Sequence, residues 1–260
     1  MKVAYFWMMP LFLIGFIVVH LAKMMRLYLI LMEQKIEFRR FVLTYLKTTF
    51  VNLVIPFKLG EIYRIFCFSR ETKVFQIGLF SVIVDRFFDT VALLVLLIPF
   101  EVLITGEVTW VTGVLTIAAI LAIFVFVVFP GIYTYLNRYI IMNKTSVRSM
   151  TALRGLEVTK TWYDYVRNLI SGRYALIILL SCAAWIAETG VLWCLSTMRS
   201  MAFGASAFSE YIAAIFMSGK SPVLTDYIWI SATIMGMLTV AGYVIYLVRH
   251  RGSQKQKKQK

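Results

Sequence analysis

Apolar stretches long enough to cross a lipid bilayer recur along this chain, separated by short polar segments. A helix needs about 20 apolar residues to cross the hydrocarbon core, with a usual range of about 17–25. The pattern predicts five spans, at residues 4–22 (with an extension up to residue 32), 77–100, 109–130, 174–197 and 227–248. Two shorter stretches contain polar interruptions, and a re-entrant helix fits them as well as a span does. They are residues 41–57 and 201–217.

This pattern predicts an all-α, polytopic integral membrane protein with about five to seven transmembrane helices, re-entrant segments included. Composition supports the fold class, since 60% of the 260 residues are hydrophobic and 15% are charged, whereas soluble domains carry about 25% charged residues. We treat residues 1–248 as a single membrane domain. The formal net charge of +14 would suggest nucleic-acid binding in a soluble protein. Here Lys and Arg gather in the connections and the tail, so no nucleic-acid partner is expected.

The distribution of Lys and Arg predicts the orientation of the spans, because cytoplasmic loops carry an excess of these residues. The connection at residues 131–173 contains seven Lys and Arg, so we expect it in the cytoplasm, with one or two amphipathic surface helices. Residues 249–260 form a basic tail with six Lys and Arg and no acid, which we also expect in the cytoplasm. When membrane crossings are counted from these cytoplasmic segments, the N-terminus is expected outside the cell and the C-terminus in the cytoplasm.

The chain contains three cysteines and two histidines. None of them stands at a spacing typical of a metal site or a disulfide framework. We therefore expect no metal and no cofactor.

A polar motif with the pattern N-x-x-x-P-x-K-x-G-E-x-x-R occupies residues 52–64. Pro56 and Gly60 are expected to interrupt a helix here, because proline removes a backbone donor and glycine permits a sharp change of direction. A new helix from about Gly60 would place Glu61 and Arg64 three positions apart, where they can pair. The motif could be the tip of a re-entrant hairpin that meets an anionic head group, or an amphipathic turn at the cytoplasmic interface. Its candidate site residues are Asn52, Lys58, Gly60, Glu61 and Arg64.

Three charged residues lie inside the apolar stretch at residues 77–100, namely Asp85, Arg86 and Asp89. Each charge at membrane depth costs about 2.5–3.5 kcal/mol on insertion scales, so such residues are usually paired and functional. Asp85 and Asp89 share one helical face, and Arg86 is three positions from Asp89. We expect Arg86 to pair with an acid inside the bundle. The three residues could be a salt bridge that only ties the span to the preceding hairpin, or they could also contact a substrate.

The stretch at residues 174–197 contains the motif W-x-x-E, formed by Trp185 and Glu188. At mid-span, Glu188 is expected to face the bundle interior or a polar cavity. It could be a hydrogen-bond partner of Arg86, or it could take up a proton that is coupled to transport.

Three motifs follow one another within residues 27–197, namely G-E-x-x-R, S-V-x-V-D-R-x-x-D and W-x-x-E. In this order they resemble the membrane domain of the lysylphosphatidylglycerol synthase family. This family also includes stand-alone, flippase-like membrane proteins of bacteria and archaea. The resemblance implies a polytopic helical domain with re-entrant segments in a bacterial inner (plasma) membrane. It also implies translocation of a lipid with a polar head, such as an aminoacylated phosphatidylglycerol or a glycolipid. The residues matched by position are Glu61, Arg64, Asp85, Arg86, Asp89 and Glu188.

Two departures from the family pattern bear on activity. The soluble aminoacyl-transferring domain is absent, so we expect a stand-alone form that is not an enzyme and does not synthesise the lipid. Where family members have a glycine-rich segment that ends in an acid, this chain reads SGKSPVLTD at residues 218–226. Most of those glycines and the acid are missing from it.

The leading interpretation is a flippase in which the basic residues of the motifs hold the head group of a membrane lipid and the acids balance their charge. The P-loop pattern of ATP-binding proteins does not occur, so the energy would come from a gradient, or the movement would be downhill. Two alternatives belong to other classes. One is a membrane enzyme that acts on lipid-linked sugars, and the other is a scaffold or subunit for a membrane glycosyltransferase or synthase.

Overall fold

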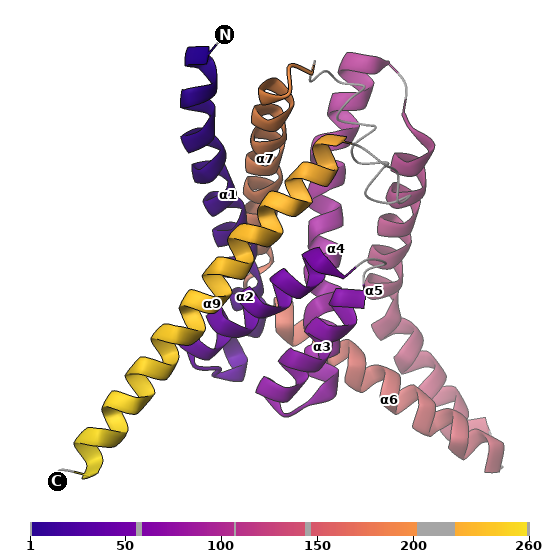
Figure 1. The fold of residues 1–260 in the computed structure, drawn as a ribbon. Helices are drawn as coiled ribbons and strands as arrows, with labels where there is room; N and C mark the ends of the chain where they lie inside the picture. The colour runs from indigo at the N-terminus through magenta and orange to yellow at the C-terminus, as the bar shows by residue number, and fades with distance from the viewer. Residues whose placement is uncertain (1, 56–58, 107, 144–146, 202–221, 259–260) are drawn as a thin grey trace.

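A computed structural model describes residues 2–55, 59–106, 108–143, 147–201 and 222–258. Throughout these residues the chain is helical, apart from short turns (Figure 1). The helices are α1 (Lys2–Leu31), α2 (Phe38–Val54), α3 (Leu59–Thr72), α4 (Phe75–Phe100), α5 (Trp110–Asn143), α6 (Val147–Ile170), α7 (Tyr174–Met198) and α9 (Pro222–Lys258). A 3₁₀ turn at Met32–Gln34 follows α1, and a π-helical turn at Glu101–Thr105 follows α4. The predicted all-α membrane fold is confirmed.

Among the described residues, four helical segments are long and apolar enough to cross a membrane: Trp7–Gln34, Trp110–Met142, Tyr174–Met198 and Pro222–Val248. The predicted fifth span, α4, is also long, with 26 residues. It differs in charge, because every stretch of 18 residues within it contains Asp85, Arg86 and Asp89. The charged residues of α4 therefore distinguish it from the four apolar helices.

Two helices continue past the limits that the hydrophobic pattern predicts. The pattern ends the third apolar stretch at residue 130, but α5 runs through Pro130 to Asn143. Proline is tolerated inside membrane helices although it removes one backbone hydrogen bond, to the carbonyl four positions earlier. At the other end of the chain, α9 continues through the basic segment at residues 249–258. The predicted re-entrant stretch at residues 201–217 falls almost entirely outside the described residues.

Helices α2 and α3 form a hairpin around the predicted break. Ile55 ends α2 in an extended conformation, with φ −87° and ψ 120°, and α3 begins at Leu59. With 17 and 14 residues, these helices are about 25 and 21 Å long, which is less than the hydrocarbon core of about 30 Å. Both lie in the lower half of the bundle in Figure 1, so the chain enters and turns back, as the sequence predicts.

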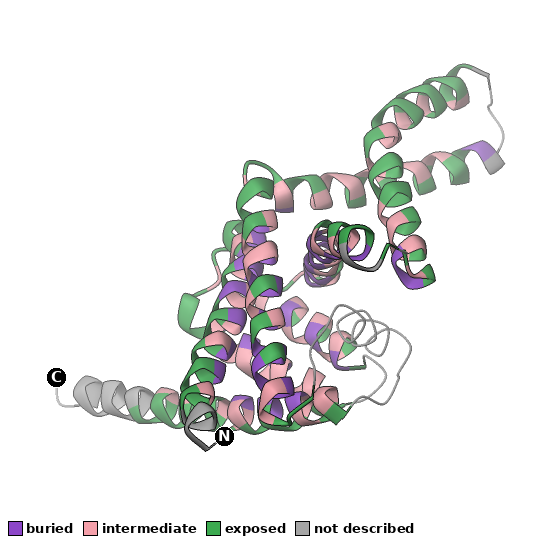
Figure 2. Ribbon diagram, turned by 90° about the horizontal axis from the view of Figure 1, so that it is seen from above, coloured by how far each residue is buried: buried purple, intermediate pink, exposed green. Residues whose placement is uncertain are grey.

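The core lies where the helices face one another, and the outer faces stay apolar. Helix α1 packs along α7, with Phe12, Val19, Leu192 and Leu195 buried between them and their neighbours. Figure 2 shows buried positions on the inward faces of the body and exposed positions around it. Since many exposed residues are large and hydrophobic, the outer surface is suited to lipid.

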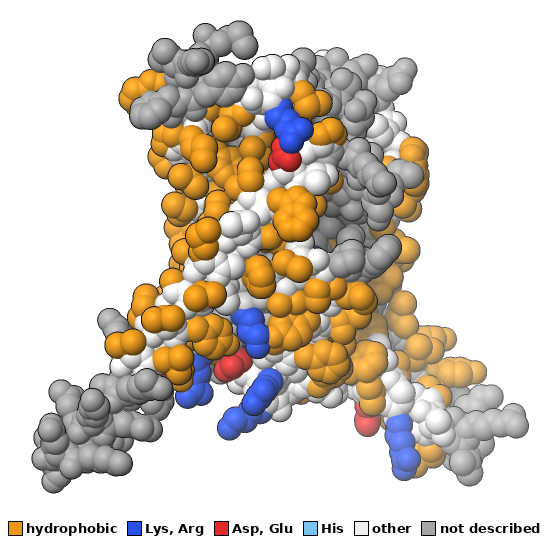
Figure 3. Space-filling model, in the orientation of Figure 1, with side chains coloured by type: hydrophobic (Ala, Val, Ile, Leu, Met, Phe, Trp, Pro, Cys, Tyr) orange, Lys and Arg blue, Asp and Glu red, His pale blue; other side chains and the backbone are white. Residues whose placement is uncertain are grey.

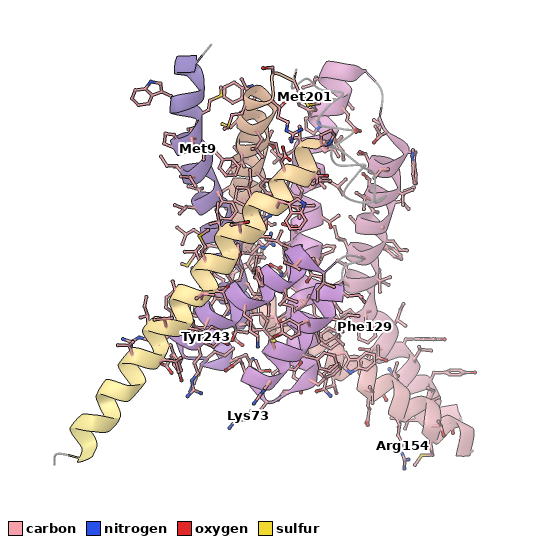
Figure 4. All side chains as sticks on the ribbon, viewed as in Figure 1. Met9, Lys73, Phe129, Arg154, Met201 and Tyr243 are labelled. Carbon is pink, nitrogen blue, oxygen red and sulfur yellow. The ribbon has the colours of Figure 1, made fainter. Side chains whose placement is uncertain are left out.

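The two ends of the bundle differ in charge. We call the end that carries Met9 and Met201 the upper end, and the end that carries Lys73 and Arg154 the lower end (Figure 4). Figure 1 places the N-terminus at the upper end and the C-terminus at the lower end. On the face drawn in Figure 3, hydrophobic side chains cover the middle, and most of the Lys and Arg side chains gather at the lower end. The termini therefore lie at opposite ends of the bundle.

Candidate functional site

A network of charged side chains lies inside the bundle, where α1, α3 and α4 meet. We call it the central charge network. Each member is within ion-pair distance of at least one other member. Its members are Arg26, Glu61, Arg64, Asp85, Arg86 and Asp89.

Arg26 lies at the centre of this network and is fully buried. Its Nε donates to Asp85 Oδ1 at 2.7 Å, and its Nη1 donates to Asp89 Oδ1 at 2.6 Å. The same Nη1 donates to the Ser181 hydroxyl of α7 at 2.9 Å. One guanidinium thus joins α1 to both acids of α4 and to α7.

Arg86 and Arg64 approach the same acids from two other directions. Arg86 Nη2 donates to Asp85 Oδ2 at 2.8 Å, and its Nη1 donates to Asp89 Oδ2 at 3.4 Å. This confirms the prediction that Arg86 pairs with an acid inside the bundle. Arg64 Nη1 lies 3.3 Å from Asp85 Oδ2 and 3.7 Å from Glu61 Oε2. Asp85, which is fully buried, is therefore shared by three arginines.

The α2–α3 hairpin positions Glu61 against the network. Glu61 Oε1 accepts a hydrogen bond from Asn52 Nδ2 at 3.2 Å and lies 3.7 Å from Arg86 Nε. The two helices touch at Gly60, where a Cβ would lie only 2.3 Å from the Asn52 Cα. Glycine is required at residue 60 because any side chain would push α3 away from α2, and Glu61 with it.

The formal charges of the central charge network cancel, since three arginines face three acids. A balanced arrangement reduces the cost of holding charge away from water. Hydrogen bonding is less complete. Among the described residues, no acceptor reaches the buried Arg26 Nη2, Arg64 Nε or Arg86 Nε. A buried donor without a partner costs about 1–3 kcal/mol, so each of these three nitrogens is available to a further acceptor.

Arg86 is the accessible member of the network. Its side chain is 41% exposed, whereas the Arg64 side chain is 6% exposed and that of Arg26 is 1% exposed. A group that arrives from outside the bundle would therefore meet Arg86 first.

A second polar cluster lies next to the network, which we call the Lys23 cluster. Lys23 Nζ pairs with Glu188 Oε2 at 2.5 Å, and the Tyr227 hydroxyl of α9 donates to Glu188 Oε1 at 3.2 Å. Lys23 Nζ also lies 5.8 Å from the centre of the Trp185 ring. The Trp185 indole N–H donates to the backbone carbonyl of Asp89 at 3.0 Å, which connects the two clusters.

The partner of Glu188 differs from the one considered from the sequence. Glu188 bonds Lys23 and Tyr227, whereas Arg86 bonds the acids of α4. The reason is the packing of α1 along α7, which brings residues 165 positions apart into contact. The hypothesis that Arg86 is its partner is wrong.

The structure brings together the residues that the sequence singled out, except Lys58, which lies outside the described residues. Sequence reasoning missed Arg26, Lys23, Ser181 and Tyr227. Arg26 and Lys23 follow directly after the first apolar stretch and look like the basic flank of a span. The available signal was the continuing apolar pattern up to residue 32, which places both inside a long helix.

Within the described residues, no group of three or more His, Cys, Asp and Glu could hold a metal ion.

Comparison with known proteins identifies the family of the chain. No curated protein and no solved structure matches it. The family model described as "Lysylphosphatidylglycerol synthase TM region" matches residues 1–243. Because this match covers most of the sequence, the chain belongs to that family of membrane domains.

Proposed function

We propose that this protein is a transporter that moves the polar head of a membrane lipid between the leaflets of the plasma membrane, rather than an enzyme. The observation that carries the proposal is the central charge network, in which three arginines share three acids and each retains a buried nitrogen without an acceptor. Guanidinium groups bind phosphate through paired, charge-assisted hydrogen bonds. A lipid phosphate would therefore find N–H donors here that no acid of the network uses. The family also supports a role that involves membrane lipids.

The mechanism follows from the difference in exposure among the three arginines. Arg86 is partly exposed and makes hydrogen bonds of 2.8 and 3.4 Å to Asp85 and Asp89. A head-group phosphate could replace these acids as its partner, while Arg26 keeps both of them bound from the buried side. Inside the bundle the phosphate would then lie beside the positively charged guanidinium of Arg86, and the acyl chains would remain in the surrounding lipid.

The direction of insertion is proposed from charge. Most of the basic side chains on the face drawn in Figure 3 lie at the lower end, and cytoplasmic loops are enriched in Lys and Arg. We therefore place the lower end and the C-terminus in the cytoplasm and the N-terminus outside. The lipid candidates are phosphatidylglycerol, its aminoacylated form and a polyprenyl-linked sugar.

The decisive experiment measures leaflet exchange of labelled lipids in vesicles that contain the purified protein. Arg86→Gln tests the network through its most exposed arginine, whose loss disturbs folding less than the loss of a fully buried one. Arg40→Gln is the matched control, because Arg40 pairs with Glu37 on the surface. We expect the wild type and R40Q to exchange at least one candidate lipid, and R86Q to lose that exchange while it still elutes as a folded protein.

Absence of exchange for every candidate lipid, with folded wild-type protein, would overturn the proposal. Turnover of a lipid-linked sugar by the same sample would then indicate the enzyme alternative. Loss of a glycosyltransferase or synthase from the membrane when this protein is deleted, with R86Q still able to retain it, would indicate the scaffold alternative.

A further inference from the structure

An apolar groove follows the face of α4 that lies away from the central charge network. It consists of two adjoining cavities between α4, α5 and α6, of about 210 and 520 Å³. They share Ala122, Phe126 and Val166, so they are direct neighbours along the same helices. The larger cavity is within the range of about 300–1,000 Å³ that is common for ligand sites. Nearly all the side chains that line the groove are aliphatic or aromatic.

The lower end of this groove is polar. A third cavity, of about 120 Å³, shares Phe129 and Tyr163 with the larger one and is also lined by Lys160, Asp164 and Arg167. Lys160 Nζ lies 4.8 Å from the centre of the Tyr133 ring and 3.9 Å from Asp164 Oδ2. With two bases and one acid, this end has an excess of one positive charge. Figure 4 shows Phe129 of α5 below the middle of the molecule and Arg154 of α6 at the lower end.

We infer that this groove is a binding site for a single anionic phospholipid, with an acyl chain along α4, α5 and α6 and its phosphate at Lys160 and Arg167. The occupant is argued from charge complementarity, because an apolar channel that ends at a positive, aromatic-lined pocket matches an acyl chain joined to a phosphate. Lys160 and Asp164 have side chains that are 43% and 46% exposed, so a head group can reach them. Basic residues at the membrane surface attract anionic lipids, and aromatic rings are enriched at that depth.

The groove is separate from the proposed transport site, although both use α4. Val84 and Phe88 line the groove, whereas Asp85 and Asp89 belong to the central charge network. Adjacent positions of a helix point in different directions, so one helix serves both sites. Within the part of the chain that the structure describes, Lys160 and Arg167 of α6 belong to none of the ion pairs of the network, and the inference does not depend on transport.

The test is native mass spectrometry of the purified full chain after exchange into mixed micelles with either phosphatidylglycerol or phosphatidylcholine. A photoactivatable acyl chain on the lipid then maps its place by the peptides that it labels. We expect phosphatidylglycerol to be retained about five- to thirtyfold better than phosphatidylcholine, as one or two basic residues at the surface imply. We also expect labelled peptides from α5 and α6.

Variants locate the two parts of the site. The double variant Lys160→Gln with Arg167→Gln should lose the preference for phosphatidylglycerol, while Arg154→Gln, an exposed base on the same helix outside the groove, should keep it. Ala122→Trp should fill the groove and remove both lipids and the labelling. Equal retention of both lipids by the wild type, or an unchanged preference in the double variant, overturns the inference and indicates ordinary surrounding lipid. Absence of labelling in α5 and α6 also overturns it and indicates that part of this chain or a second copy covers the groove.

Discussion

Ion pairs in this protein occur in two settings with different consequences. In the central charge network, Arg26 and Asp85 are fully buried and bonded at 2.7 Å, and each has further partners in the same network. At the start of α2, Arg40 and Glu37 are 3.4 Å apart and both side chains are 59% exposed. Buried pairs leave an uncompensated charge when one partner is removed, whereas exposed pairs contribute little because water replaces the partner. The comparison predicts that burial, and not the number of ion pairs, decides which pairs the fold depends on.

The largest effect is expected when the shared acid is removed. Asp85→Asn takes a negative charge from a fully buried side chain and leaves three arginines facing two acids. We expect a loss of about 3–5 kcal/mol, the range for breaking a buried pair from one side. The measurement is the thermal unfolding temperature and folded yield of the purified protein. A melting curve that matches the wild type would mean that water reaches Asp85 and that the network is not enclosed.

A second variant pair tests whether charge balance is what stabilises the network. Arg26→Met and Asp85→Leu should each be strongly destabilising alone, because each leaves unequal numbers of bases and acids. The double variant restores two bases and two acids and should be less destabilised than the sum of the two single variants by about 0.5–3 kcal/mol. A chemical-denaturation series on all three variants measures this coupling. Additive effects would indicate that the two residues act separately.

The close approach between α2 and α3 gives a test of intermediate size. Gly60→Ala adds a Cβ that would lie 2.3 Å from the Asn52 Cα, so the hairpin must shift, at a cost of about 1–3 kcal/mol. Gly155→Ala in α6 is the matched control, since nothing lies within 4 Å of its added Cβ. This control should stabilise the helix by about 0.5–1 kcal/mol. If both substitutions change the melting temperature in the same direction, the contact at Gly60 is not a constraint.

The smallest effect is expected at the surface. Arg40→Gln should change the free energy of unfolding by no more than about 0.5 kcal/mol, as is usual for exposed positions, and should leave lipid exchange unchanged. Thermal unfolding at low and high salt measures this directly. A large destabilisation by R40Q would remove the contrast between the two kinds of ion pair.

Much of the fold could be predicted because its determinants are local. Helix length follows from the length of an apolar run, and the end of α2 follows from Pro56, since the residue before a proline disfavours helix and Ile55 is extended. The prediction that Gly60 interrupts a helix was wrong, because Gly60 lies inside α3 and its lack of a side chain serves the close contact with Asn52. The polar face of α4 follows from the spacing of Asp85 and Asp89. Prediction failed at the end of α5, because Pro130 resembles a stop signal, whereas the helix continues through it to Asn143 at the loss of a single backbone hydrogen bond.

The all-α membrane fold and the positions at which charge enters it could be inferred from the amino-acid pattern alone, since apolar length and helical spacing are properties of short segments. Which charges meet depends on how the helices pack. Arg26 contacts Asp85 and Asp89 from 59 and 63 residues away, and Lys23 contacts Glu188 from 165 residues away. These distances along the chain are closed by the packing of α1 against α4 and α7. In the bundle interior a charged side chain is stable only where such packing supplies its partner.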